Sequence, residues 1–332
     1  MKTMLLAVGG NSLIRAGEKG TIAEQRANAQ RTAAAIAKLV SDGFRIVLTH
    51  GNGPQVGAAL LRSERAASQV PGQPLDVCDA STQGEIGYLL QQSLDTELHL
   101  AGVDMPVVTL LTQVVVSLDD PAMRCPTKPI GPFHSLAEAA SRRASLGWQI
   151  VEDAARGYRR VVASPEPMAI VELEIIRDLV EQGALVIACG GGGIPVAWKN
   201  GHLQGVEAVI DKDRASALLA SHLGVDLFVI STDIDYVYLD YKQPNQRPLH
   251  TVGSRELRKY AEAGHFPPGS MGPKVESVLR FLHQGGREAI ITSDVSLCRA
   301  VAGSAGTHVI SEKKISVAAE SHQRYERLAG SR

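Results

Sequence analysis

Six short aliphatic runs constrain the fold of this 332-residue chain more than any other feature of the sequence. The runs are apolar throughout and are bounded by residues that favour turns. Uniformly apolar runs of this length are typical of the interior strands of a parallel sheet, which helices cover on both faces. The predicted strands comprise residues 3–8, 45–49, 106–111, 185–189, 227–231 and 289–292.

Longer amphipathic segments lie between these runs and are predicted to be helices. Strands that alternate with helices imply a doubly wound α/β sandwich with right-handed crossovers. The predicted helices comprise residues 24–42, 84–101, 167–182, 213–223 and 273–284.

Residues 117–164 interrupt this alternation. The segment carries prolines at 121, 126, 129 and 132, and only residues 135–145 have a helical pattern. We therefore expect an excursion with a small structure of its own. We expect the chain to divide near Pro165 into an N-terminal half that carries this excursion and a C-terminal half, and the charged segment 313–332 to be peripheral.

The composition excludes several classes of protein. With 44% hydrophobic and 21% charged residues, the chain is expected to fold rather than to be disordered. A net charge of −1 provides no general attraction to nucleic acid or to an anionic membrane. We find no apolar stretch of the ~18 to 20 residues needed to span a bilayer and no signal peptide, so we expect a cytoplasmic protein.

The four cysteines are Cys78, Cys125, Cys189 and Cys298. Their spacing matches no C-x-x-C zinc or redox motif, and they are too few for a disulfide framework. We therefore expect reduced, mostly buried thiols.

Glycine-rich loops follow three of the predicted strands. They contain Gly9-Gly10-Asn11-Ser12, the segment 50–57 (His-Gly-Asn-Gly-Pro-Gln-Val-Gly), and Gly190 to Gly193. In an open α/β sheet such loops lie where ligands bind, and their backbone N–H groups can approach an anion closely. The spacing is not the dinucleotide fingerprint, because Val56 and Pro195 stand where its last glycine belongs, and there is no P-loop motif. A nicotinamide-dependent oxidoreductase is therefore disfavoured.

Three lysines stand in unusual places. Lys212 and Lys274 lie in the first turns of predicted helices, where a cation opposes the helix dipole, and Lys128 is fixed between prolines. Any one of them alone is typical of a solvated surface charge. Together, beside the glycine loops and the acids Asp211 and Asp213, they predict a site for anionic oxygens.

Other catalytic patterns are absent from the sequence. There is no H-E-x-x-H or comparable histidine spacing and no G-x-S-x-G, so a metalloenzyme or a serine hydrolase is disfavoured. The residues Asp233, Asp235, Tyr236 and Tyr238 follow a predicted strand and could either line a nucleotide pocket or belong to the core.

Taken in order, these motifs resemble those of the carbamate kinases in the amino acid kinase family. The resemblance rests on residues 9–11, 50–57, 126–133, 188–195, 205–213 and 269–274. It implies a three-layer αβα sandwich with a mainly parallel sheet, a small protruding subdomain at about 117–164, and a homodimer. It also implies a single domain with an acyl-phosphate-binding half, 1–165, and a nucleotide-binding half, 166–332. The implied reaction is reversible phosphoryl transfer between ATP and carbamate, giving ADP and carbamoyl phosphate.

The resemblance also assigns roles to residues. Lys128, Lys212 and Lys274 would act on the transferring phosphate, and Asp213 would orient the lysines. Substrate binding would fall to Gly9, Gly10, Asn11, Gly51, Asn52 and Gly53. Nucleotide binding would fall to Asp233, Tyr238, Met271, Gly272 and Lys274, with Mg²⁺ carried on the nucleotide phosphates and no dedicated metal ligands.

Five positions depart from the family pattern, although every lysine and loop glycine is present. They are Ser12, Thr82, Glu85, His134 and Glu166. Two alternatives therefore stay open. One is a kinase of another small carboxylate or carbamate, and the other is a nucleotide-binding regulatory protein without turnover.

Overall fold

The computed structural model describes residues 1–10, 13–15, 17–152, 157–267 and 271–312. Its centre is an eight-stranded sheet with the order β15-β17-β16-β12-β1-β2-β9-β3. The predicted strands are all found here, as β1 (Lys2–Val8), β2 (Phe44–His50), β3 (Val107–Thr109), β9 (Leu185–Ile187), β12 (Leu227–Thr232) and β16 (Glu288–Ser293). The edge strand β15 (Thr251–Gly253) and its neighbour β17 (Thr307–Ile310) were not predicted.

Neighbouring strands of this sheet pair in parallel, except that β16 and β17 are antiparallel. The predicted mainly parallel sheet is therefore confirmed. Its carboxyl edge is where β1 ends at Val8, β2 at His50 and β12 at Thr232.

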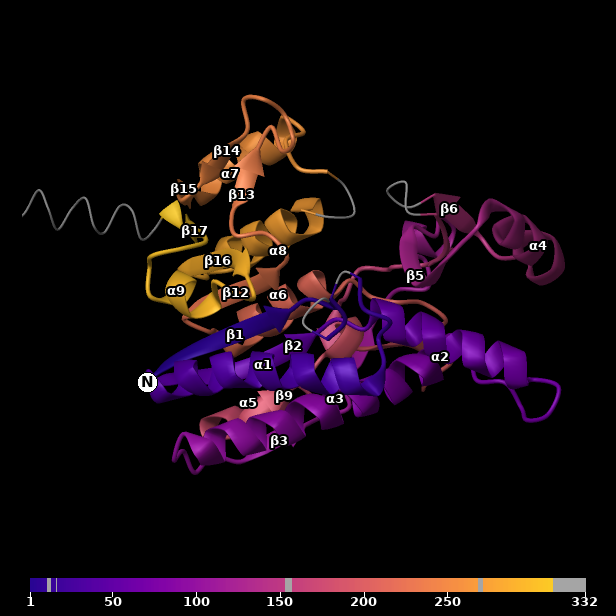
Figure 1. The fold of residues 1–332 in the computed structure, drawn as a ribbon, viewed down its shortest axis with the longest axis horizontal. Coiled ribbons are helices and arrows are strands. Elements are labelled where there is room, and N and C mark those ends of the chain that lie inside the picture. The colour runs from indigo at the N-terminus through magenta and orange to yellow at the C-terminus, as the bar shows by residue number, and fades with distance from the viewer. Residues whose placement is uncertain (11–12, 16, 153–156, 268–270, 313–332) are drawn as a thin grey trace, which may run out of the picture.

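The side chains of β1 show how the sheet is covered on both faces. Leu5 and Ala7 belong to one buried cluster, whereas Met4, Leu6 and Val8 belong to another on the opposite face. The first cluster includes residues of α5 (Leu173–Glu181), α6 (Lys212–Leu223) and α8 (Met271–His283). The second includes residues of α1 (Ile22–Ser41), α3 (Leu75–Leu100) and α9 (Leu297–Val301). The result is the expected three-layer αβα sandwich (Figure 1).

Helix boundaries differ from the predictions where local signals were weak. The start of α1 follows a capping box, in which Glu24 N donates to Thr21 Oγ1 and Thr21 N donates to Glu24 at 2.8 Å. In contrast, α3 begins at Leu75, well before the predicted residue 84, and α5 begins only at Leu173. The helix α2 (Gly53–Ala66), which has Pro54 in its first turn, was not predicted.

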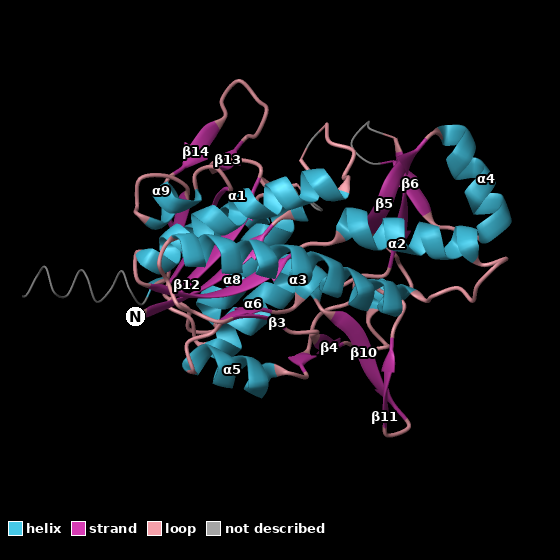
Figure 2. Ribbon diagram, turned by 60° about the horizontal axis from the view of Figure 1, so that its bottom comes forward, coloured by secondary structure: helices cyan, strands magenta, loops and turns pink. Residues whose placement is uncertain are grey.

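Smaller sheets flank the main one. A four-stranded sheet has the order β11-β10-β4-β8, and β13 pairs with β14 in a hairpin that precedes α7 (Figure 2). The strands are β4 (Gln113–Val115), β8 (Ala169–Ile170), β10 (Ile194–Lys199), β11 (His202–Gly205), β13 (Val237–Leu239) and β14 (Arg247–Leu249); α7 spans Ser254–Glu262. None of them was predicted.

Residues 128–152 and 157–162, which we call the lobe, project from one end of the molecule (Figure 1). Their strands form a separate sheet with the order β5-β7-β6, and α4 follows β5 close to the predicted residues 135–145. The elements are β5 (Lys128–His134), α4 (Leu136–Leu146), β6 (Ile150–Glu152) and β7 (Tyr158–Val162), preceded by the short helix η2 (Pro121–Met123). Ala139, Trp148 and Ile150 form a small core for the lobe.

All four cysteines are free thiols, as predicted. Cys78 and Cys189 are buried, Cys298 is half-buried, and Cys125 is exposed just before the lobe. Within the described ranges, no helix combines the length and apolarity that a membrane span requires.

Candidate active site

The two glycine loops that follow β1 and β2 meet at the carboxyl edge of the sheet. Gly51 N donates to Val8 O at 3.2 Å, and a Cβ on Gly51 would lie 3.2 Å from Gly10 N and 3.7 Å from Lys212 Cδ. The structure therefore brings Gly9, Gly10, Gly51, Asn52 and Gly53 close to Lys212. Asn11, the other predicted substrate residue, and Ser12 lie outside the described residues.

The third glycine loop, which includes the short helix η3 (Gly190–Gly192), packs against the second. A Cβ would lie 2.4 Å from His50 Nε2 if placed on Gly190, and 2.3 Å from Asn52 Nδ2 if placed on Gly191. At Gly192 it would lie 2.4 Å from Ile210 O. Glycine fits at these positions because it has no side chain. The loop can therefore pack between the end of β2 and the segment just before α6.

Asp211 anchors both the start of α6 and the lysine of the lobe. Its Oδ1 accepts from Asp213 N at 2.9 Å and from Arg214 N at 3.3 Å, which caps the helix. Its Oδ2 pairs with Lys128 Nζ at 2.5 Å. Burial opposes ionisation of Asp211, but the Lys128 charge prevails and the pKa of Asp211 is lowered. Sequence analysis did not identify Asp211 as the partner of Lys128.

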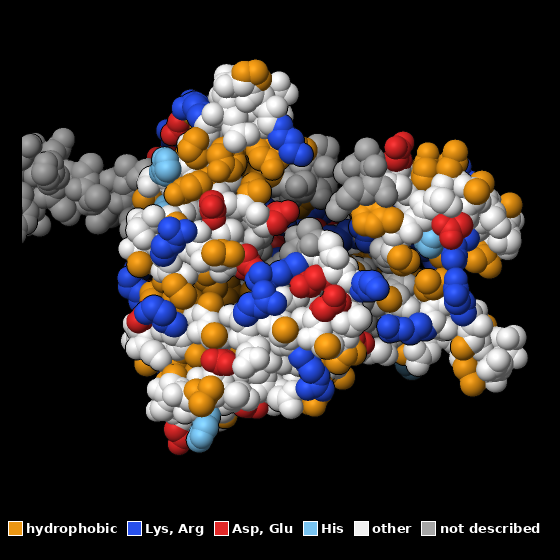
Figure 3. Space-filling view, in the orientation of Figure 1, with side chains coloured by type: hydrophobic (Ala, Val, Ile, Leu, Met, Phe, Trp, Pro, Cys, Tyr) orange, Lys and Arg blue, Asp and Glu red, His pale blue; other side chains and the backbone are white. Residues whose placement is uncertain are grey.

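Asp213 holds the other two lysines. Its side chain is 4% exposed, with Oδ1 2.8 Å from Lys212 Nζ and Oδ2 2.9 Å from Lys274 Nζ. The contact with Lys212 lacks hydrogen-bond geometry, and Lys212 Nζ is a buried ammonium without a hydrogen-bond acceptor among the described residues. Three lysines thus share two aspartates, so the cluster carries one positive charge in excess and favours an anion. Basic side chains are visible in the hollow between the lobe and the body (Figure 3).

The ionisation of this cluster follows from burial and pairing. Burial lowers the pKa of Lys212. Burial opposes the charge on Asp213, yet the Lys212 and Lys274 ammoniums prevail and hold the pKa of Asp213 well below its usual range. Burial also opposes the charge on Lys274, but the Asp213 carboxylate prevails and raises the pKa of Lys274. Asp213 is therefore an ionised partner of the lysines and not a proton acceptor near neutral pH.

Three of the predicted nucleotide residues, Met271, Gly272 and Lys274, lie in the first turn of α8. Met271 is the buried first residue of α8, and Gly272 N donates to Pro267 O at 3.0 Å. Asp233 is exposed just beyond β12, and its charge contributes to the raised pKa of Lys274. Tyr238 is half-buried in β13, with its ring centroid 5.9 Å from that of Tyr241.

Two further candidates beside the nucleotide residues have structural partners. Asp235 accepts from Ser293 Oγ at 2.5 Å and from Ser296 Oγ at 2.7 Å, which ties the loop after β12 to the loop after β16. The Tyr236 ring packs on His250, with centroids 4.8 Å apart.

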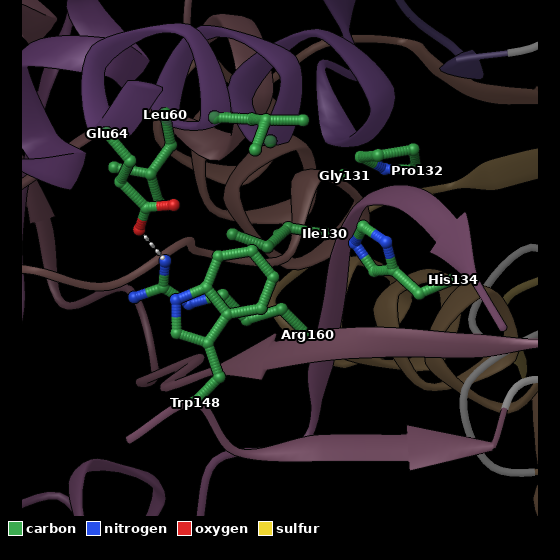
Figure 4. Close-up of a pocket in the computed structure, with 10 residues that line it drawn as sticks. Leu60, Glu64, Ile130, Gly131, Pro132, His134, Trp148 and Arg160 are labelled. Carbon is green, nitrogen blue, oxygen red and sulfur yellow. Dashed lines mark hydrogen bonds and ion pairs between the residues drawn. The ribbon is translucent and has the colours of Figure 1, made fainter. Parts of the chain in front are cut away.

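The lobe docks on α2 through a close backbone contact. A Cβ on Gly57 would lie 2.0 Å from Gly131 N and Cα, and beside this contact Arg160 pairs with Glu64 at 2.7 Å (Figure 4). The Trp148 ring lies 4.8 Å from the guanidinium carbon of Arg160. The docking places β5, and with it Lys128, over the start of α6.

Four departures from the family pattern fall on described residues. His134 lies in this docking contact, with its ring centroid 5.8 Å from that of Trp148, and Glu85 is half-buried on α3. Glu166 joins a closed ring of ion pairs through Arg214, Glu276 and Arg280. Because Arg214 follows Asp213 on α6 and Arg280 lies on α8, this ring ties the segment after the lobe to both lysine-bearing helices.

Sequence analysis missed a buried polar network on α3. Asn52 Nδ2 donates to Asp79 Oδ1 at 2.9 Å and to Thr82 Oγ1 at 3.0 Å. Thr82 had been noted only as a departure from a family pattern. His50, also buried, has its pKa lowered to about 4 by burial, so its ring is neutral near pH 7. Polar residues on the core face of an amphipathic helix were the signal that could have identified this network.

No group of three or more His, Cys, Asp or Glu side chains within the described part of the chain could hold a metal ion. Both carboxylates of the cluster, Asp211 and Asp213, are already paired with lysines. These residues fit a metal that arrives with a phosphorylated ligand better than one held by the protein alone.

Comparison with known proteins gives concordant results. The model of the amino acid kinase family matches residues 2–293. The carbamate kinase of Thermococcus kodakarensis is 48% identical over 316 residues, which is 94% of this chain and 100% of that protein. That of Pyrococcus furiosus is 46% identical, covering 93% and 99% of the two chains.

Solved structures agree with these sequences. Carbamate kinase from Giardia lamblia bound to AMP-PNP superposes with a TM-score of 0.87 at 41% identity, covering 94% of this chain and 99% of that one. An N-acetylglutamate synthase from Neisseria gonorrhoeae shares the fold alone, with a TM-score of 0.51 at 18% identity.

Proposed function

The chain belongs to the amino acid kinase family, among its carbamate kinases, and from this premise we propose that it transfers a phosphoryl group reversibly between ATP and carbamate. The products are ADP and carbamoyl phosphate. The observation that carries the proposal is the pair of ammoniums, Lys212 and Lys274, held on the two oxygens of the buried Asp213. Such a pair supplies the fixed positive charge that a transferring phosphoryl group requires.

The residues fit a reaction that needs no general base. Carbamate is already an anionic oxygen nucleophile, so no proton has to be removed from it. Asp213 is ionised and paired, and the neutral ring of His50 has a pKa of about 4. Lys212 and Lys274 stabilise the negative charge on the equatorial oxygens, and the protein contributes alignment in addition.

Lys128 reaches the same cluster from the lobe and neutralises the acyl phosphate. Its ion pair with Asp211 fixes the ammonium beside the start of α6. The substrate groups lie against the loops after β1 and β2, at Gly9, Gly10, Asn11, Gly51, Asn52 and Gly53. In this proposal residues 1–165 bind the acyl phosphate and residues 166–332 bind the nucleotide.

The nucleotide lies at Asp233, Tyr238, Met271, Gly272 and Lys274. Mg²⁺ binds together with the nucleotide, because the nucleotide phosphates supply oxygen ligands and the aspartates of the cluster are paired with lysines. When bound, the ion neutralises phosphate charge and orients the terminal phosphoryl group.

The physiological direction is ATP synthesis from carbamoyl phosphate in the cytoplasm, and the working unit is a homodimer. Size-exclusion chromatography with light scattering tests the dimer. Transfer to another small carboxylate and a regulatory role without turnover remain the competing functions.

A coupled assay for ATP formation from ADP tests the activity, with carbamoyl phosphate, acetyl phosphate and glutamyl phosphate as donors. Turnover with carbamoyl phosphate in strong preference to the other two is the expected result. Preference for another donor would assign a different acyl-phosphate kinase. No turnover with any donor, in the presence of Mg²⁺, would favour the regulatory role.

A further inference from the structure

The side-chain amide of Asn52 is held in one orientation by α3. Thr82 Oγ1 donates its single proton to Asp79 O at 2.9 Å, so toward Asn52 it can only accept. The atom of Asn52 that lies 3.0 Å away must therefore be the amide nitrogen. The same nitrogen donates to Asp79 Oδ1 at 2.9 Å, which uses both of its protons.

This orientation leaves the carbonyl oxygen of Asn52 as the free end of the amide. None of the described residues donates a hydrogen bond to Asn52 Oδ1. Asn52 stands directly after Gly51, which packs against Gly10 and the Lys212 side chain. An acceptor is thus located in the loop that the proposed function assigns to the carbamoyl group.

The acceptors among the other side chains of the cluster are the Asp211 and Asp213 carboxylates, and both are already paired with lysines. The three ammoniums, Lys128, Lys212 and Lys274, and the backbone N–H groups of the glycine loops match the oxygens of an acyl phosphate. They cannot match the amino group of carbamate, whose nitrogen lone pair is delocalised and which only donates. A buried N–H without an acceptor is costly, so recognition of carbamate requires an acceptor here.

We propose that Asn52 Oδ1 accepts an N–H of the carbamoyl group, and that Thr82 and Asp79 are positioning residues that make the site select carbamate over acetate. Acetate has nearly the same shape but presents a methyl group to this oxygen, which would then stay unsatisfied. Burial raises the pKa of Asp79 well above its ordinary value, which favours the neutral acid, and its Oδ1 accepts from Asn52 in either form. The inference rests on the proposed function and specifies how it achieves selectivity.

The test measures kcat/KM with ADP for carbamoyl phosphate and for acetyl phosphate, and takes the ratio of the two. Thr82→Val removes the hydroxyl at nearly constant shape, and Thr82→Ser puts a hydroxyl back. Asp79→Leu removes the second acceptor, whereas Asp79→Asn keeps an acceptor oxygen. Ser81→Val makes a comparable change on the exposed face of the same helix, where Ser81 bonds only within the helix at Val77 O.

We expect the ratio to fall by about 10-fold or more in Thr82→Val and in Asp79→Leu, because the Asn52 amide is no longer held in one orientation. The ratio should fall because kcat/KM for carbamoyl phosphate falls, while KM for ADP is unchanged. Thr82→Ser, Asp79→Asn and Ser81→Val should keep the wild-type ratio. Either Thr82→Val or Asp79→Leu is sufficient to test the proposal, so the test remains possible if one of them does not fold.

Two results would overturn the inference while the proposed function stands. One is wild-type enzyme that uses acetyl phosphate as well as carbamoyl phosphate. The other is a ratio unchanged in Thr82→Val and Asp79→Leu, even if both rates fall, because an equal loss means that α3 only supports the loop. Wild-type enzyme without any turnover of carbamoyl phosphate would instead refute the proposed function and this inference with it.

Discussion

Replacing Gly57 by alanine tests whether the docked position of the lobe controls the site. In the structure, the added Cβ would lie 2.0 Å from Gly131 N and Cα and 3.0 Å from the carbonyl carbon of Ile130. Ordinary carbon contacts are about 3.5–4.0 Å, so β5 must move away from α2 by about 1.5–2 Å. Lys128 lies on the same strand, and its ion pair with Asp211 at 2.5 Å cannot survive such a shift unchanged.

The fold should tolerate the substitution. Alanine is a better helix former than glycine by about 0.5–1 kcal/mol, so α2 itself is not weakened. A misplacement of about 1 Å in an active site can cost on the order of 10²-fold in rate. We expect KM for carbamoyl phosphate to rise at least about 10-fold and kcat to fall, while KM for ADP and the melting temperature change little.

Steady-state ATP formation, with each substrate varied in turn, measures these effects. Gly84→Ala is the matched control, because it also lies in a helix and its added Cβ meets nothing within 4 Å. Lys128→Ala should reproduce the rise in KM for carbamoyl phosphate. Wild-type constants in Gly57→Ala would refute the reasoning, since they would mean that the contact between the lobe and α2 does not place Lys128.

Three further predictions concern charge. Asp213→Asn should lower kcat and move the alkaline limb of the pH–rate profile to lower pH, because the pKa of Lys212, already lowered by burial, loses the carboxylate that raises it; an unmoved limb would contradict this. The buried His50, with a pKa of about 4, is neutral when folded and titrates at about 6.5 when unfolded, so its contribution to stability is complete above pH ~6.5 and is lost as pH falls to about 4. In urea unfolding, His50→Gln should therefore lose up to about 3 kcal/mol less unfolding free energy than wild type when the pH falls from ~6.5 to about 4. The same loss in both proteins would show that His50 is not responsible for it. Glu166→Gln should lower the free energy of unfolding by no more than about 1 kcal/mol, because its ion pairs are partly exposed; the difference should vanish at high salt, and one that persists there would rule out a screened ion pair.

The sequence predicted the parts of the fold that depend on local patterns. Strands such as β1 and β12 are buried on both faces, and a continuous apolar run is sufficient to recognise them. The helix α2 buries an apolar face that includes Val56 and Leu60. It was missed because the glycines and polar residues among them obscure the helical pattern in the sequence. The four-stranded sheet was missed because its strands are short and are separated widely along the chain.

The candidate site shows the same division. Three lysines in glycine-rich or proline-rich loops were conspicuous, and the structure places all three on Asp211 and Asp213. The pairing of Lys128 with Asp211 joins residues from the lobe and from α6, and no local pattern encodes such a contact. The bonds from Asn52 to Asp79 and Thr82 likewise depend on how α3 packs against the loop after β2.

The rate constant of Lys212→Ala tests the central claim most directly. If the buried ammoniums on Asp213 stabilise the transferring phosphoryl group, kcat at saturating ADP and carbamoyl phosphate should fall by about 10² to 10³, with much smaller changes in both KM values. Lys274→Ala should behave in the same way. A near-wild-type kcat, with the loss confined to KM, would contradict the account, because the lysine would then bind substrate and transition state equally.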